Sequence, residues 1–113
     1  MKEILIKMNI KSDNDNYSYN GIANLNRDII TFCDKDEYIF DKRINRLSKI
    51  NKNKKIIIDF NNKLINISDK DNRINIDIDV TKKDISENKI EIIYKIDKNR
   101  FNFKLIIEGD FNE

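Results

Sequence analysis

Apolar and polar residues alternate along most of this chain, with a period of two residues. The clearest case is residues 74–80, in which three isoleucines and a valine alternate with Asn75, Asp77 and Asp79. Successive side chains of a β-strand point to opposite faces of a sheet, whereas a helix places apolar residues three and four positions apart. The pattern therefore predicts β-strands. The segments that carry it are residues 4–10, 17–25, 29–33, 38–40, 56–60, 63–68, 74–80, 90–96 and 101–107.

One segment does not follow this period cleanly. Ile44, Leu47 and Ile50 lie three positions apart, which one or two turns of helix would also explain. We expect a strand here because the neighbouring segments are strands, and we expect Ile44, Ser48 and Ile50 to face the interior. This choice also turns Arg46 inward, so a short helix stays open as the alternative.

Polar segments separate the predicted strands and supply the turns. The pair Asn61-Asn62 suits a tight hairpin because asparagine tolerates the positive φ that such turns require. The longer polar segment 82–88 is expected to be a loop. No internal sequence repeat and no linker divides the chain, so residues 1–113 are predicted to form one domain.

The predicted strands must cover one another's apolar faces. An open sheet would leave one apolar face and both edge strands exposed to water. Closing the sheet into a barrel buries that face and removes the edges. We therefore predict an all-β fold, in the form of a small antiparallel β-barrel of about eight to ten strands.

Several short stretches resemble one known family. They include Val80-Thr81-Lys82 with Ile85, Ile90-x-Ile92-x-Tyr94, Leu105-x-Ile107-Glu108-Gly109, and near the start residues 6–12 with Gly21. On these residues the chain resembles the YwiB-like family of small bacterial calycin-type β-barrels, whose function is not established. The resemblance implies a calycin-like barrel from a bacterium, and it supplies no catalytic residue. The chain departs from the family by a shortening near residues 67–72, where Asn72 stands in place of an expected glycine.

Composition excludes several kinds of chemistry. Charged residues make up 37% of the chain and hydrophobic residues 39%, which is enough apolar content for a globular core. Histidine is absent and Cys33 is the only cysteine, which excludes histidine-based catalysis, a cysteine–histidine zinc site and an intramolecular disulfide. The 20 carboxylates show no distinctive pairing, and their spacing does not match a calcium-binding loop. We therefore expect no enzyme activity, no cofactor and no metal site.

No segment is typical of a membrane span or a secretory leader. The longest apolar run has three residues, whereas roughly 20 are needed to cross a bilayer as a helix. The net charge is +2, which gives no strong attraction to anionic surfaces. We expect a cytoplasmic protein that does not associate with membranes.

The most pointed local feature is the basic segment, residues 42–55. It carries seven positive charges and no negative charge, and Tyr38 and Phe40 precede it as candidate base-stacking groups. The pattern favours a solvated, lysine-rich face, and the alternative is binding of polyanions or single-stranded nucleic acid. The candidate residues are Lys42, Arg43, Arg46, Lys49, Lys52, Lys54 and Lys55.

The function expected from the sequence is binding without catalysis. The candidate ligand is a small apolar molecule in the barrel or a protein partner on its surface, although core packing explains most of the aromatic residues. Leu5, Ile93 and Ile106 stand on otherwise polar strand faces, which favours a second contact surface or a homodimer.

Overall fold

The computed structural model describes residues 1–111, which fold into eleven strands that form a single antiparallel sheet. These residues contain no helix. The strands are β1 (Lys2–Ser12), β2 (Asn16–Asn26), β3 (Ile29–Asp34), β4 (Asp36–Asp41), β5 (Arg46–Ile50), β6 (Lys54–Asp59), β7 (Leu64–Asp69), β8 (Arg73–Asp77), β9 (Asp79–Ile85), β10 (Lys89–Ile96) and β11 (Asn99–Asp110). The prediction of an all-β barrel is confirmed, although the strands number eleven rather than eight to ten.

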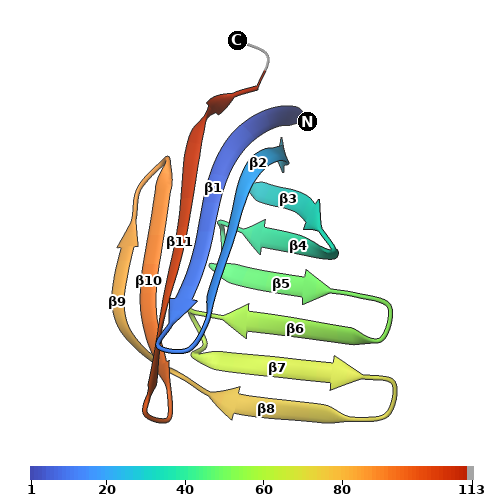
Figure 1. Ribbon diagram of the computed structural model, residues 1–113, viewed down its shortest axis with the longest axis vertical. Coiled ribbons are helices and arrows are strands. Elements are labelled where there is room, and N and C mark those ends of the chain that lie inside the picture. Colours follow the sequence, from blue (N-terminus) through green and yellow to red (C-terminus); the bar gives the residue numbers. More distant parts are fainter. Residues whose placement is uncertain (112–113) are drawn as a thin grey trace.

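Each strand pairs with its neighbours in the chain, with one exception. The sheet runs in the order β8-β7-β6-β5-β4-β3-β2-β1-β11-β10-β9, so β11 returns to pair with β1. β8 and β9 follow one another in the chain but do not pair, and they form the two edges of the sheet. The fold is therefore a nearly closed up-and-down barrel with a seam between β8 and β9. Figure 1 shows β1, β2 and β9–β11 running along the molecule and β3–β8 running across it.

The seam begins at Ile78, inside the segment 74–80 that the sequence predicts to be one strand. The apolar alternation continues through Ile78, so the pattern gave no sign that the chain changes direction there. Ile78 is buried, and its N–H donates a hydrogen bond to the carbonyl of Lys63 at 3.1 Å, which fixes the corner. The loop expected at 82–88 is also wrong in part, because its first half belongs to β9.

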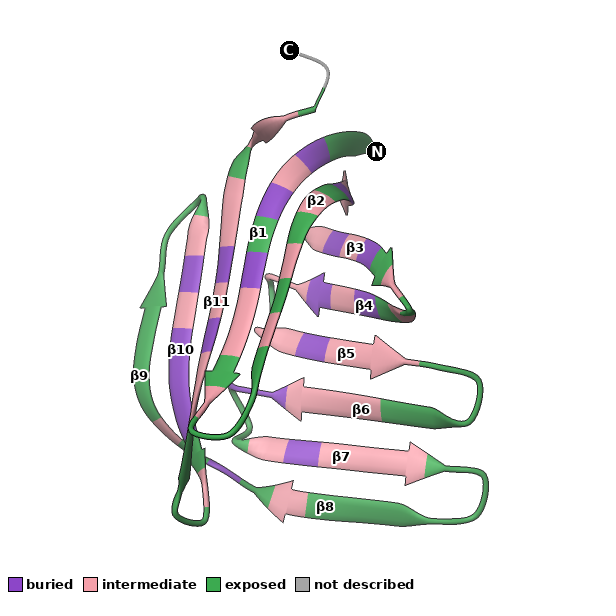
Figure 2. Cartoon of the chain, viewed as in Figure 1, coloured by how far each residue is buried: buried purple, intermediate pink, exposed green. Residues whose placement is uncertain are grey.

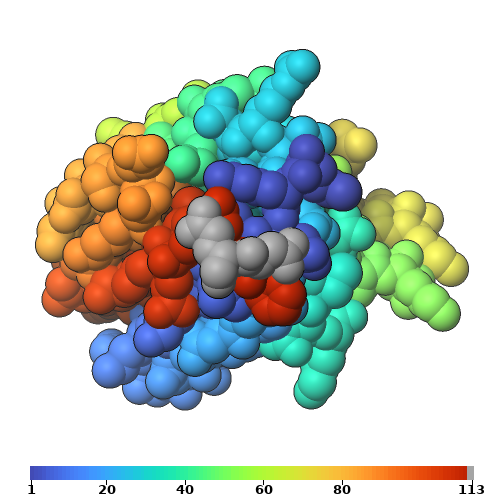
Figure 3. Space-filling model, turned by 90° about the horizontal axis from the view of Figure 1, so that it is seen from above, coloured from blue at the N-terminus to red at the C-terminus, as the bar shows by residue number. Residues whose placement is uncertain are grey.

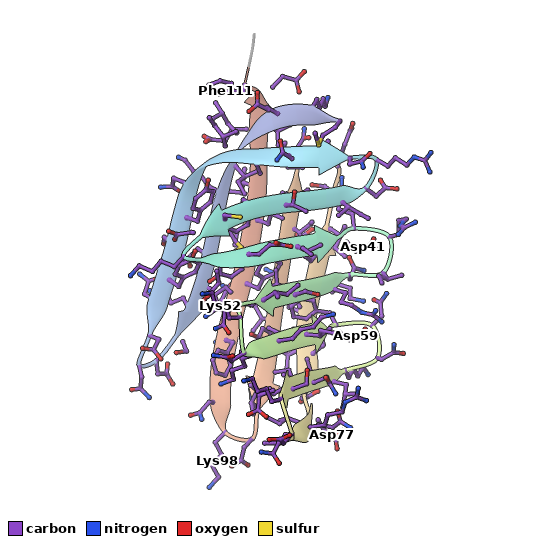
Figure 4. The ribbon with its side chains drawn as sticks, turned by 90° about the vertical axis from the view of Figure 1, so that its right-hand side faces the viewer. Asp41, Lys52, Asp59, Asp77, Lys98 and Phe111 are labelled. Atoms are coloured by element: carbon purple, nitrogen blue, oxygen red, sulfur yellow. The ribbon has the colours of Figure 1, made fainter. Side chains whose placement is uncertain are left out.

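Three hairpins recur along the chain at a spacing of 18 residues. Each hairpin starts after a residue with positive φ and ends on an aspartate, and Figure 4 shows the three aspartates along one side of β3–β8. The residues with positive φ are Arg27, Asn45 and Lys63, and the aspartates are Asp41, Asp59 and Asp77. The residue after each of these aspartates donates its backbone N–H to a carbonyl in the turn that precedes the same hairpin, at 2.9–3.1 Å. The donors are Lys42, Phe60 and Ile78, and the acceptors are Asp28, Asn45 and Lys63, respectively. The repeat lies in the backbone, and among the side chains it is marked by these aspartates.

β5 is a strand, as expected, but its other face points inward. Leu47 is 3% exposed and lies opposite a buried phenylalanine of β4, whereas Ile44, Ser48 and Ile50 are not buried. The four-residue turn before β5 contains a residue with positive φ and shifts the alternation by one position. Arg46 therefore faces outward, and no arginine has to be accommodated in the core.

Inward side chains from both walls fill the middle of the barrel. Phe40, Phe60 and Phe103 are at most 2% exposed, and the ring centroid of Phe103 lies 5.5 Å from that of Phe40 and 5.6 Å from that of Phe60. Buried positions recur along β1, β10 and β11 (Figure 2). Most of the aromatic residues pack in the core, so the middle of the barrel is solid rather than a channel.

β2 forms the corner between the two walls. It pairs with β1 from Asn16 to Leu25, but with β3 only from Asn24 to Asn26. Along the first part of β2, this strand diverges from β3, so the sheet is open between β2 and β3. The β5–β6 and β7–β8 turns protrude on one side when the molecule is seen from the end that carries the termini (Figure 3).

Candidate functional site

A pocket opens where β2 diverges from β3. It has a volume of about 570 Å³ and lies between the β1–β2 hairpin, the strands β4–β6 and the start of β11. This volume is within the range that holds small organic ligands. We call it the mouth pocket, and its apolar lining consists of Ile10, Leu47, Ile56, Ile58 and Phe101.

The mouth pocket lies at the end of the barrel that carries the β1–β2 hairpin, where other core side chains do not fully cover the inward residues of the walls. Ile10, Ile56 and Ile58 point inward but are only half-buried. On β1, the inward residues Ile4 and Ile6 near the other end are at most 1% exposed. The apolar surface of these half-buried residues is therefore available to a ligand.

Tyr17 and Tyr38 form one side of the mouth pocket. Their rings stack with centroids 5.6 Å apart, and the Tyr17 hydroxyl donates a hydrogen bond to Oδ2 of Asp34 at 2.7 Å. Burial and this carboxylate acceptor both raise the pKa of the Tyr17 phenol above its ordinary value. Tyr17 therefore stays protonated at neutral pH and is a fixed part of the wall.

Lys49 is the only candidate residue of the basic segment that lines the mouth pocket. Its Nζ lies 3.5 Å from Oδ2 of Asp36 and 5.9 Å from the centroid of the Tyr38 ring. Asp15 is the acidic residue in the lining. The charge of Lys49 is already compensated, so the pocket does not require a charged ligand.

The structure does not bring the basic segment together on one surface. The chain runs across the sheet in β5, so the β4–β5 turn with Lys42 and Arg43 lies at one side and Lys52 lies at the other. Figure 4 shows Lys52 on the side opposite to Asp41 and Asp59. The prediction of polyanion binding by these residues stays a prediction.

Two of the basic side chains are held by neighbouring carboxylates. The guanidinium group of Arg43 hydrogen-bonds to Asp41 at 2.9 Å and holds the pKa of that carboxyl below its usual value. Arg46 hydrogen-bonds to Asp59 at 2.9 Å.

A shallow depression lies between the β5–β6 and β7–β8 turns, with Lys52, Lys54, Lys55 and Lys70 among its lining residues. Lys42 donates a hydrogen bond to the carbonyl of Glu87 at 3.2 Å.

The apolar residues predicted for a second contact surface are less exposed than expected. Ile93 is only 8% exposed, and Leu5 and Ile106 are half-buried. Ile93 lies outside the core cluster, opposite Asn102 and Lys82 on the neighbouring strands. Long polar side chains can cover apolar surface in this way, so this face offers no broad apolar patch.

Within residues 1–111 no three cysteine, aspartate or glutamate side chains gather as a candidate metal site. The same residues include no helix long and apolar enough to cross a membrane.

Comparison with known proteins adds no relative. A scan against protein-family models finds no matching family, and searches of curated proteins and of solved structures also find no match. The resemblance to the YwiB-like family therefore stays a prediction, and the function must be argued from the geometry of this chain.

Proposed function

We propose that this protein is a non-catalytic binding module that takes a small, uncharged, largely apolar molecule in the mouth pocket. The observation that carries the proposal is an apolar pocket of about 570 Å³ beside a core that is otherwise filled. Burial of apolar ligand surface there would contribute roughly 25 cal/mol per Å² of area removed from water.

The polar groups of the mouth pocket support an uncharged ligand. Lys49 is paired with Asp36, and the Tyr17 hydroxyl is already hydrogen-bonded to Asp34. An anionic ligand group would have to take Lys49 from Asp36, and a buried charge without a partner is costly. The remaining polar side chains of the lining include Ser12, Asp15 and Asn16, which can orient a ligand through single hydrogen bonds.

The test uses the apolar fluorescent probe N-phenylnaphthylamine with the purified chain. We expect saturable binding, and we expect Ile56→Gln to weaken it about tenfold or more, because an amide on the pocket wall must lose water without gaining a partner. Fluorescence titration gives both dissociation constants.

Ile57→Gln is the matched control for this experiment. Ile57 is next to Ile56 on β6 and lies opposite Ser48 on the outer face of the sheet. We expect the Ile57→Gln substitution to leave the dissociation constant of the probe unchanged. Equal weakening by both variants, or no saturable binding by the natural chain, would contradict the proposal.

The second candidate function, polyanion binding, depends on the lysines of the shallow depression. Lys52, Lys54 and Lys55 form no ion pair among residues 1–111. If this candidate is correct, single-stranded oligothymidine should bind with an affinity that falls steeply as salt rises. The double variant Lys52→Glu with Lys54→Glu should then abolish binding, whereas Lys95→Glu with Lys98→Glu should not. Absent or salt-independent binding would remove the candidate.

A further inference from the structure

We propose that the free edge of β2 is a docking site for an extended, basic peptide, which binds by adding a strand to the sheet. The site is centred on Ser18 and Asn20, which lie outside the lining of the mouth pocket, and the proposal does not rest on the function proposed above. Three observations carry it: the unpaired backbone of β2, the absence of charge along this strand, and an acidic rim around the opening.

The first part of β2 has unpaired backbone groups on one side. The N–H of Ser12 donates to the carbonyl of Asp15 at 2.8 Å, so these two residues form a hydrogen-bonded pair of the β1–β2 ladder. Bonded and non-bonded pairs alternate in an antiparallel ladder, and the register is unbroken along β2. Ser18 and Asn20 are therefore in non-bonded pairs, and their N–H and C=O groups point away from β1.

No described strand meets these groups. Pairing with β3 starts only at Asn24, and Ser18 and Asn20 are exposed. The next carbonyl on this edge, that of Ile22, already accepts a hydrogen bond from the Tyr19 hydroxyl at 2.7 Å. Strand addition would therefore be centred on Ser18 and Asn20.

β2 also lacks the features that protect the other edges of this sheet. Its residues 16–26 contain no charged side chain, and they form the longest uncharged run in a chain of which 37% is charged. The edge strand β9 carries Lys82, Lys83 and Asp84 and has a register shift, and β8 carries Arg73. Charges and bulges prevent edge strands from pairing with other chains, so β2 is the edge that is open to pairing.

A groove beside β2 provides room for an added strand. It has a volume of about 430 Å³ and lies between β2 and β3, with Tyr19, Ile22 and Phe32 among its walls. The rings of Tyr19 and Phe32 stack with centroids 4.3 Å apart and form an apolar floor. An added strand can place alternate apolar side chains on this floor and expose the others to water.

The charge around the opening specifies a basic occupant. The β3–β4 turn carries Asp34, Asp36 and Glu37 with one lysine, and the tip of the β1–β2 hairpin carries Asp13 and Asp15. Asp36 is paired with Lys49 of β5, which leaves four carboxylates of the rim against one lysine of the turn. This rim is acidic although the whole chain has a net charge of +2. A second copy of the chain would bring the same carboxylates to the rim, whereas a peptide with lysine or arginine at its ends would complement them.

The test uses a short peptide, acetylated and amidated, in which valine and threonine alternate between two terminal lysines. Its binding to the natural chain is measured by isothermal titration calorimetry. We expect binding that Asn20→Pro weakens about tenfold or more, because proline removes the outward N–H and blocks the added strand. Proline is tolerated at this position because the N–H does not bond to β1.

Asn75→Pro on β8 is the matched control. At the β7–β8 turn the N–H of Asp69 donates to the carbonyl of Asn72, so these two residues form a hydrogen-bonded pair. Bonded and non-bonded pairs alternate from there, which makes Asn66 and Asn75 a non-bonded pair. The N–H of Asn75 therefore points to the free side of β8. This variant should bind the peptide as the natural chain does. N-methylation of the alternate peptide residues that face β2 should abolish binding, and replacing the lysines by glutamates should weaken it about tenfold.

Each other outcome overturns the proposal. Binding that is insensitive to Asn20→Pro or to this N-methylation of the peptide would exclude strand addition, and equal binding of the glutamate peptide would exclude the acidic rim as a determinant. Oligomerisation of the natural chain that Asn20→Pro abolishes would identify a second copy as the occupant. Probe binding to the mouth pocket is measured separately, so failure here is distinguishable from failure of the proposed function.

Discussion

Replacing Phe103 by alanine should lower the free energy of unfolding by about 3–5 kcal/mol. Phe103 is 0% exposed, and its ring packs against Phe40 and Phe60, which come from the opposite wall of the barrel. Truncation leaves a cavity between the two walls that neither can close without moving its strands. Denaturation with urea, followed by circular dichroism, measures the loss.

Phe111→Ala provides the control for this substitution. Phe111 is the same residue type but is 43% exposed at the end of β11. We expect its truncation to change the free energy of unfolding by less than about 0.5 kcal/mol. Equal losses in the two variants would show that Phe103 does not join the two walls.

Asp59→Asn should lower the free energy of unfolding by about 1–3 kcal/mol at neutral pH. Asp59 is 8% exposed and accepts hydrogen bonds from the backbone N–H and the side-chain amide of Asn62, at 3.0 and 2.8 Å, and from Arg46 at 2.9 Å. The substitution removes the negative charge beside Arg46 and places an N–H donor where an acceptor is needed. Urea denaturation at pH 7 measures the difference.

The pH dependence of this difference has a definite sign. Burial acts to raise the pKa of Asp59, but the hydrogen bonds from Asn62 and the charge of Arg46 outweigh it, so the folded-state pKa lies below the ordinary value. A depressed carboxyl pKa contributes stability that is complete above the unfolded-state pKa and is lost as pH falls through the folded-state pKa. The gap between the natural chain and Asp59→Asn should therefore be constant near neutral pH and shrink below about pH 5. A gap that widens on acidification would contradict this account.

The strands could be predicted from the sequence because each has an apolar face that must be buried. The cleanest alternation, in residues 90–96 and 101–107, belongs to β10 and β11, which lie in the centre of one wall. What the alternation could not indicate was where a strand ends. Ile78 continues the period of two although the chain changes direction there. A bent backbone can still direct every second side chain into the barrel.

The face of β5 was mispredicted for a related reason. The residues 44, 47 and 50 are three apart, and only the turn geometry before Arg46 decides which face of the strand Leu47 occupies. The mouth pocket was even less accessible to prediction. Ile56 and Ile58 show the same alternation as the buried residues of β1, and the lack of a covering side chain at this end depends on where β2 leaves β3.

The spacing of Asp41, Asp59 and Asp77 was a signal that could have been used. Three aspartates at intervals of 18 residues each end a hairpin, and two of them accept hydrogen bonds from backbone N–H groups of the following turn. A capping carboxylate is one of the few side chains that a turn requires. In a sequence so rich in lysine and asparagine, the intervening residues hid this regularity.

This barrel is filled in the middle and has an apolar pocket at one end. The most direct test is methyl nuclear magnetic resonance on a chain labelled at its 24 isoleucines, titrated with N-phenylnaphthylamine. We expect the methyl signals of Ile10, Ile56 and Ile58 to shift with a single dissociation constant, while those of the core residues Ile6 and Ile92 stay fixed. Shifts spread evenly over core and pocket isoleucines, or no shifts at saturating probe, would contradict it.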